Sequence, residues 1–141
     1  MDSNWYSKIE PTIITRLQYY LRGSPLFENL VCTTTTQNLV EDEETVRGNF
    51  PTLYLQVRNA ETGQDLDNTE VNAVNCTARI TVYCNKSKSD CEDIADAALA
   101  VMKTMRFNAP ELPLVTEYKN IFLASMTCRR VIGAGDKSII D

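Results

Sequence analysis

The sequence predicts an α+β fold, with a mainly antiparallel sheet and two helices packed on one face. Apolar residues recur with helical spacing near the start and again from about residue 90. Elsewhere apolar and polar residues alternate with the period of half-buried strands. The order of helix, strands, helix and strand contains no linker or repeat, so we expect a single domain over 1–141.

The first helix is predicted over about 8 to 22. Ile9, Ile13, Leu17 and Leu21 recur every four residues, which places them on one side of a helix. A glycine and a proline follow directly, and both are typical stop signals. The β-branched run over 30–36 then predicts a strand.

Two strands in the middle of the chain, over 50–58 and 71–84, are predicted to pair antiparallel. Arg58 and Arg79 fall on their more polar faces. The polar stretch 59–69 between them is expected to be a turn or a hairpin loop. The apolar positions expected to face the core are Leu53, Leu55, Val57, Ala78, Ile80, Val82 and Cys84.

A second helix is predicted over 90–106, and it is the clearest element of the sequence. Ser89 and Glu92 have the spacing of a capping box, in which each side chain satisfies a free backbone amide of the first turn. Its expected buried stripe is Cys91, Ile94, Ala95, Ala98, Leu99, Met102 and Met105. The pattern is β again from 112 to 132, and because the long strand predicted over 118–132 is apolar on both sides, we expect it to be covered on both faces.

Composition excludes several classes of function. The chain has no histidine, so Ser-His-Asp, Cys-His and His-ligated metal mechanisms are absent. A net charge of −5 and the lack of a long basic cluster argue against nucleic acid as the primary ligand. No stretch is long and apolar enough to span a membrane, and the start lacks a secretory pattern, so we expect folding in a cytoplasm.

The five cysteines are expected to be reduced core thiols, because their number is odd and no CxxC pair exists. On one continuous strand Cys76 and Cys84 would lie roughly 26 Å apart, which excludes a disulfide between them. Cys91 falls in the first turn of the second predicted helix, where the helix dipole can stabilise a thiolate. It has no accompanying base in the sequence pattern.

Two groups of charged residues are the candidate functional residues. The acidic run Glu41, Asp42, Glu43 and Glu44 is interpreted as a solvated loop, and with Asp65 and Asp67 it forms a candidate assembly or lumen segment. Arg129 and Arg130 are candidate inter-subunit contacts. Neighbours on a strand point to opposite faces, so they cannot clamp one ligand jointly. We expect no catalytic residue, metal or cofactor.

Five segments follow one another in a characteristic order, which are 13–17 (IITRL), 50–57 (FPTLYLQV), 78–83 (ARITVY), 91–102 (CEDIADAALAVM) and 126–133 (MTCRRVIG). This layout resembles the tail terminator, or tail-completion, proteins of long-tailed bacteriophages. The resemblance covers most of the chain and contains no catalytic or ligand-binding motif.

The resemblance implies a structural role rather than an enzyme. Subunits of this family form a ring, usually hexameric, on the last ring of the tail tube and end its polymerisation. The implied partners are other copies of the chain, the tail tube protein and the head-tail connector protein. DNA would pass through the lumen without specific binding, and the protein would be at the head-proximal end of the virion tail after assembly in the host cytoplasm.

Three alternatives belong to other classes. A head-tail connector or adaptor protein would use a similar domain and bind portal protein rather than tube protein. A ferredoxin-like regulatory domain would have a concave apolar pocket for a ligand. An enzyme would have to use a cysteine or carboxylates.

Overall fold

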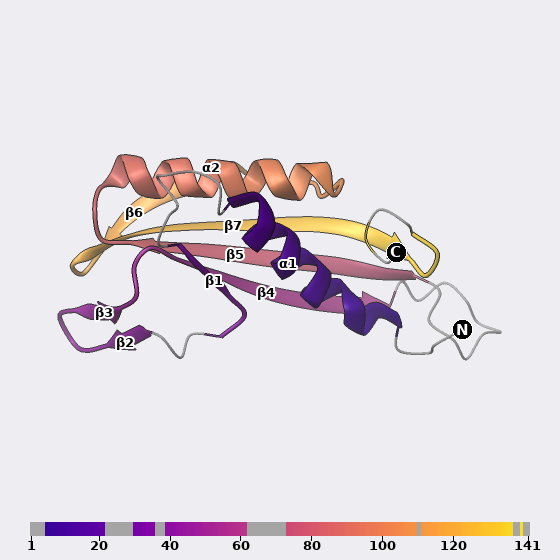
Figure 1. The fold of residues 1–141 in the computed structure, drawn as a ribbon, viewed down its shortest axis with the longest axis horizontal. Coiled ribbons are helices and arrows are strands. Elements are labelled where there is room, and N and C mark those ends of the chain that lie inside the picture. Colours follow the sequence, from indigo (N-terminus) through magenta and orange to yellow (C-terminus); the bar gives the residue numbers. More distant parts are fainter. Residues whose placement is uncertain are drawn as a thin grey trace.

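The computed structural model describes residues 5–21, 30–35, 39–61, 73–109, 111–136 and 139. A five-stranded sheet has the order β1-β4-β5-β7-β6, and the two-stranded hairpin β2-β3 lies near one end of it (Figure 1). The predicted α+β fold with a mostly antiparallel sheet is therefore confirmed. The elements are η1 (Trp5–Lys8), α1 (Ile9–Leu21), β1 (Val31–Thr33), β2 (Leu39–Glu41), β3 (Val46–Gly48), β4 (Thr52–Glu61), β5 (Ala73–Cys84), α2 (Lys88–Thr104), β6 (Leu114–Tyr118) and β7 (Ile121–Gly133).

Three long antiparallel strands, β4, β5 and β7, form the centre of the sheet. Leu55 lies opposite Ile80, and Ile80 lies opposite Met126, so apolar residues of one face line up across the strands. The predicted antiparallel pairing of the two middle strands is confirmed. At the edges, β1 pairs with β4 in parallel and β6 pairs with β7 antiparallel.

The strand predicted over 118–132 is wrong at its start, because Tyr118 belongs to β6 and pairs with Ile121 of β7. Lys119 and Asn120 form the two-residue turn between these strands. Lys119 has φ of 53°, the left-handed conformation that tight hairpin turns require. The apolar residues on both sides of this short polar pair conceal the turn in the sequence.

The core lies between the two helices and one face of the sheet. Helix α1 contacts β1 and β4, α2 contacts β5, β6 and β7, and the helices contact each other. The expected apolar stripes of both helices are buried, with Leu99 only 5% exposed. The largest fully buried side chains of this core are Ile9, Ile13, Leu17, Leu53, Leu55, Ile80, Ile94, Met102, Met105, Ile132 and Ile139.

The other face of the sheet is open over most of its length. Ile121 at the start of β7 is fully buried, and Val46 of the hairpin is buried nearby. Beyond this end, β7 presents half-buried Ser125 and exposed Val131 to the open side. The expected cover on both faces is thus right only at the start of β7 and wrong beyond it, because the short strands of the hairpin extend over one end only.

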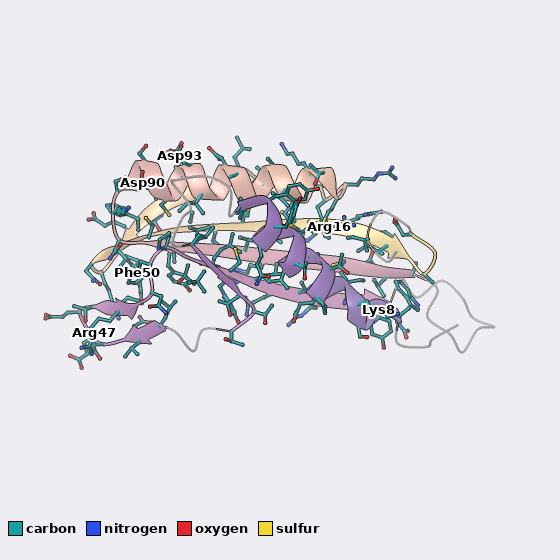
Figure 2. The ribbon with its side chains drawn as sticks, in the orientation of Figure 1. Lys8, Arg16, Arg47, Phe50, Asp90 and Asp93 are labelled. Carbon is teal, nitrogen blue, oxygen red and sulfur yellow. The ribbon has the colours of Figure 1, made fainter. Side chains whose placement is uncertain are left out.

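Helix α2 begins two residues before the predicted capping box. The side chain of Ser87 accepts a hydrogen bond from the Asp90 amide at 3.0 Å, and Ser87 has the extended backbone of an N-cap. The predicted cap at Ser89 is therefore wrong. Ser87 and Asp90 have the same spacing as Ser89 and Glu92, and the chain has already left β5 at Cys84, so the helix starts at the earlier serine. Asp93 lies on the outer side of α2 (Figure 2).

We expect Leu99→Ala to lower the free energy of unfolding by about 2 to 5 kcal/mol, because it leaves a cavity beneath α2. Ser87→Ala removes only the cap and should cost about 1 kcal/mol. Ser89→Ala is the matched control, and since Ser89 is exposed within the helix, its effect should be near zero. Urea denaturation of the three variants measures these differences, and equal losses for Ser87→Ala and Ser89→Ala would contradict the cap assignment.

Candidate functional site on the open face of the sheet

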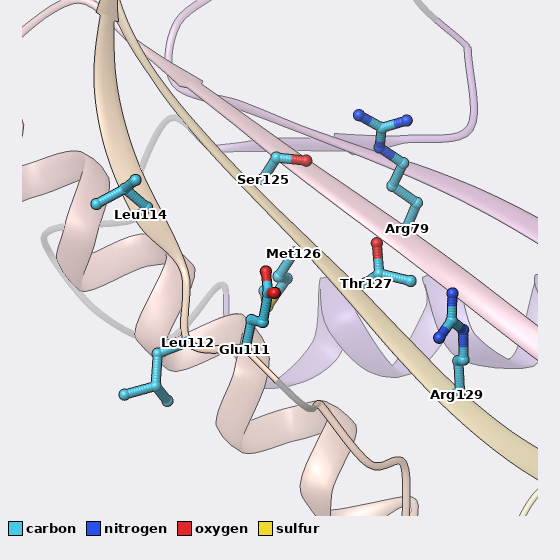
Figure 3. A pocket seen from close by; sticks show the side chains of 8 residues that line it. All are labelled: Arg79, Glu111, Leu112, Leu114, Ser125, Met126, Thr127 and Arg129. Carbon is cyan, nitrogen blue, oxygen red and sulfur yellow. The ribbon is translucent and has the colours of Figure 1, made fainter.

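The strand register brings three arginines together on the open face. Arg79 of β5 lies opposite Thr127 of β7, while Thr77 of β5 lies between Arg58 of β4 and Arg129 of β7. All three arginines therefore occupy adjacent strands within two residues along the sheet. Figure 3 shows Arg79 and Arg129 extending to the same side of the sheet. We refer to Arg58, Arg79 and Arg129 as the arginine patch.

None of the three arginines of the patch forms an ion pair within the described part of the chain. All three side chains belong to exposed residues. The ion pairs among described residues involve other cations, namely Arg47, Lys119 and Arg130. The open-face positions of β4, β5 and β7 include no aspartate or glutamate. The patch is therefore a positively charged surface on a chain whose net charge is −5.

Two shallow depressions meet at Arg79. One, of about 360 Å³, lies toward β6 (Figure 3), and the other, of about 430 Å³, lies toward β4. Guanidinium and hydroxyl groups dominate their polar lining, and these groups suit carboxylate or phosphate oxygens. One carboxylate, Glu111, lies at the β6 side. The lining residues are Arg79, Glu111, Leu112, Leu114, Ser125, Met126, Thr127 and Arg129 for the first, and Gln56, Val57, Arg58, Thr77 and Arg79 for the second.

Arg130 points to the opposite face from Arg129, as the alternation predicted. Its guanidinium donates to the backbone oxygen of Met105 at 2.7 Å and to the carboxylate of Asp136. The side chain is 9% exposed, so Arg130 links the end of α2 to the turn after β7 within its own chain. An inter-subunit contact of either arginine stays a prediction.

The acidic run forms the end of one hairpin strand and the loop that follows it. Glu41 ends β2, Val46 begins β3, and the Asp42 amide donates to the Thr45 carbonyl at 2.8 Å across the turn. The interpretation as an exposed loop is confirmed for residues 42–44, while Glu41 belongs to β2. The sequence conceals this hairpin because each strand has only three residues. The other acidic candidates, Asp65 and Asp67, lie outside the described residues.

The hairpin is fastened to the turn between β6 and β7. The Val46 amide donates to the Asn120 side chain at 2.7 Å, and the Asn120 amide group donates back to the Val46 carbonyl at 3.2 Å. Lys119 donates to Glu41 at 2.7 Å, and the Tyr118 hydroxyl also donates to Glu41. The hydrogen bonds from Lys119 and then Tyr118 lower the pKa of Glu41 below its ordinary value of 4.5.

Two of the four acidic side chains remain without an ion pair in the described part of the chain. Glu41 pairs with Lys119, and Asp42 pairs with Arg47 at 2.7 Å. Figure 2 shows Arg47 on the hairpin, away from the core. Glu43 and Glu44 are exposed at the turn. The hairpin, which hydrogen bonds hold to the turn between β6 and β7, therefore presents two carboxylates without an ion pair among the described residues. We refer to Glu43 and Glu44 as the acidic turn.

All five cysteines are free thiols, and four of them are buried. Burial, with a smaller effect of nearby Cys84, raises the pKa of Cys91 to about 12. The Cys91 thiol donates weakly to the Val82 carbonyl at 3.8 Å. Burial therefore disfavours the Cys91 thiolate that the position near a helix start suggested. Cys76 and Cys84 lie on one strand, β5, as expected.

The described residues hold no group of three or more His, Cys, Asp or Glu side chains placed to bind a metal ion. None of the helices among them is long and apolar enough to cross a membrane. Neither a family model nor a curated protein matches the sequence.

The arginine patch is the feature that sequence reasoning missed. The alternation placed Arg58 and Arg79 on polar strand faces, and that much was available from the sequence. Their approach to Arg129 depends on the register between β4, β5 and β7. Register follows from turn length and pairing, which a run of alternating residues does not specify.

The hairpin attachment should depend on pH at both ends of the scale. The pKa of Glu41 is lowered, so the ionised carboxylate stabilises the folded protein. This stabilisation is complete above pH 4.5 and disappears as the pH falls through the lowered pKa. The hydrogen bond to Glu41 raises the pKa of Lys119, so the charged ammonium group also stabilises the folded protein. This stabilisation is complete below pH 10.5 and disappears as the pH rises through the raised pKa. In Lys119→Gln, an NMR titration should place the Glu41 midpoint closer to 4.5. An unchanged midpoint would contradict the attachment.

Native Cys91 should resist alkylation at pH 8, because it is fully buried and its pKa is about 12. Mass spectrometry after iodoacetamide treatment should find Cys91 modified only when denaturant is present. Since the folded pKa lies above the ordinary value of 9.0, the thiol stabilises the fold below pH 9.0 and loses this effect progressively above it. Rapid modification of Cys91 in the native protein would contradict its burial.

Proposed function

We propose that this protein is a structural virion protein that caps the tail tube as an oligomeric ring, ends tube polymerisation and forms the head-tail joining surface. The observation that carries the proposal is the open face of the sheet. Long strands form this face, and exposed apolar residues lie at its β6 edge. Such a surface suits contacts between proteins. The resemblance of the chain to tail terminators supplies the kind of assembly.

The exposed apolar residues lie where a neighbouring subunit could cover them. Leu112, Leu114 and Val131 are 76%, 73% and 58% exposed. Leu114 belongs to β6, the edge strand of the sheet, and Val131 belongs to the adjacent β7. An edge strand also presents backbone groups without a partner strand. Contact with another subunit would cover these backbone groups together with the exposed apolar side chains. A closed ring leaves no such edge exposed.

The proposed partners are other copies of this chain in a ring, hexameric as in the resembled family, together with the tail tube protein and the head-tail connector protein. DNA would pass through the lumen without specific binding. The proposed location is the head-proximal end of the virion tail, after assembly in the host cytoplasm. The adaptor alternative differs in its partner, because it requires binding to portal protein in place of tube protein.

The proposal predicts that the protein shortens tail tubes. Tube protein of the same virus is polymerised with increasing amounts of this chain, and tube lengths are measured by negative-stain electron microscopy. We expect shorter tubes with a ring of density at one end, and native mass spectrometry should detect a closed oligomer with tube protein present. Unchanged tube lengths together with a monomeric mass would refute the proposal, and binding to portal protein alone would favour the adaptor.

Leu114→Asp should weaken ring formation, since Leu114 is 73% exposed in the single chain and the proposed contact would have to bury the new charge. Losing a buried leucine alone costs about 1.5 to 3 kcal/mol, which is roughly 10-fold to 100-fold in affinity per contact. Tyr20→Asp is the matched control, because Tyr20 is 62% exposed on α1, away from the β6 edge. Equal loss of the ring in both variants would contradict a contact at the β6 edge.

A further inference from the structure

The molecule carries two charged surfaces of opposite sign, and the one carboxylate that lines a depression with the arginine patch is Glu111 at the β6 side. The arginine patch contributes three exposed guanidinium groups on adjacent strands. The acidic turn contributes the exposed carboxylates of Glu43 and Glu44. None of these side chains takes part in an ion pair within the described residues. Each surface therefore has the chemistry that the other lacks.

The two surfaces cannot meet within one molecule in this structure. The acidic turn is held at Lys119 and Asn120, beside the start of β7. Thr127, the residue opposite Arg79, lies seven positions beyond Asn120 along the chain, which is roughly 23 Å of strand. Arg129 lies about 30 Å from Asn120 by the same measure. Pairing of the two surfaces therefore requires a second molecule.

We propose that the acidic turn of one copy docks on the arginine patch of the next copy, as the electrostatic contact of a head-to-tail assembly. This inference rests on the proposed function, because it supplies a contact for the ring. Carboxylates bind guanidinium groups through paired, charge-assisted hydrogen bonds. A contact between two different surfaces of identical chains closes into a ring when the rotation between neighbours allows it.

The attachment of the hairpin favours this contact. Asn120 holds Val46 through two hydrogen bonds, and Lys119 pairs with Glu41. The acidic turn is thus presented on a support that is already ordered, so docking loses less conformational entropy than docking of a free loop. Lys119 and Arg47 also neutralise Glu41 and Asp42, which leaves two carboxylates for the neighbouring patch.

A nucleic acid is the competing occupant of the arginine patch. Phosphate groups would find the same guanidinium donors, but a chain of net charge −5 repels a polyanion over longer distances. The acidic turn is present at the same concentration as the patch and is part of the same assembly. We therefore take the second copy as the occupant, and the experiment below separates the two.

A charge exchange between two variants tests the contact. The patch variant carries Arg79→Glu and Arg129→Glu, and the turn variant carries Glu43→Lys and Glu44→Lys. All four residues are exposed, so both variants should fold, which circular dichroism checks. We expect neither variant alone to form the ring with tube protein, because each then apposes like charges. An equimolar mixture should restore it, because each interface of an alternating ring again joins opposite charges.

A matched control reverses two cations elsewhere. Lys86→Glu with Lys88→Glu changes the net charge as much as the patch variant does, at exposed positions before and at the start of α2. This control should form the ring normally. The wild-type ring should also weaken with salt, because the Debye length falls from about 10 Å at 0.1 M to about 3 Å at 1 M.

The outcomes separate this inference from the proposed function. If the wild type forms no ring with or without tube protein, the proposed function fails and this inference fails with it. If the patch variant alone forms the ring, or the mixture does not restore it, the docking contact is overturned while the ring stands. If the patch variant keeps the ring but loses binding to a short DNA duplex that the wild type binds, the occupant is nucleic acid.

Discussion

The structure depends on burial at one face of a long antiparallel sheet. The apolar residues of β4, β5 and β7 align across the strands, and both helices cover that face. A strand alternates its side chains, so aligning the apolar set on one side necessarily aligns the polar set on the other. The arginine patch is thus a by-product of the register that builds the core. A shift of one strand by one residue would disrupt both.

The elements that could be predicted are those with long, regular patterns. Helix α2 and strands β4 and β5 repeat their apolar positions over at least two turns or several alternations, and their buried faces were predicted correctly. The N-cap was misplaced because Ser87 and Ser89 fit the capping pattern equally well in the sequence. The choice between them follows from where β5 ends, which is a property of the sheet rather than of the helix.

The parts that escaped prediction are short or depend on pairing between distant segments. The hairpin strands have three residues each, too few for a period, and the hairpin is held by Asn120 far along the chain. The arginine patch combines three strands whose relative register no local pattern specifies. Candidate interaction sites on this molecule therefore depend on tertiary pairing, while its core depends on local periodicity. This division explains why the fold class could be predicted and the patch could not.

The two-residue turn at Lys119 and Asn120 does more than connect β6 to β7. Both of its side chains hold the hairpin, so a surface turn becomes the joint between two sheets. Exposed turns are ordinarily the places where a chain accepts inserted residues most easily. Here one inserted residue would separate the lysine from the asparagine and displace the acidic turn from its support. The length of this turn is therefore constrained by a contact with residues more than 70 positions earlier in the chain.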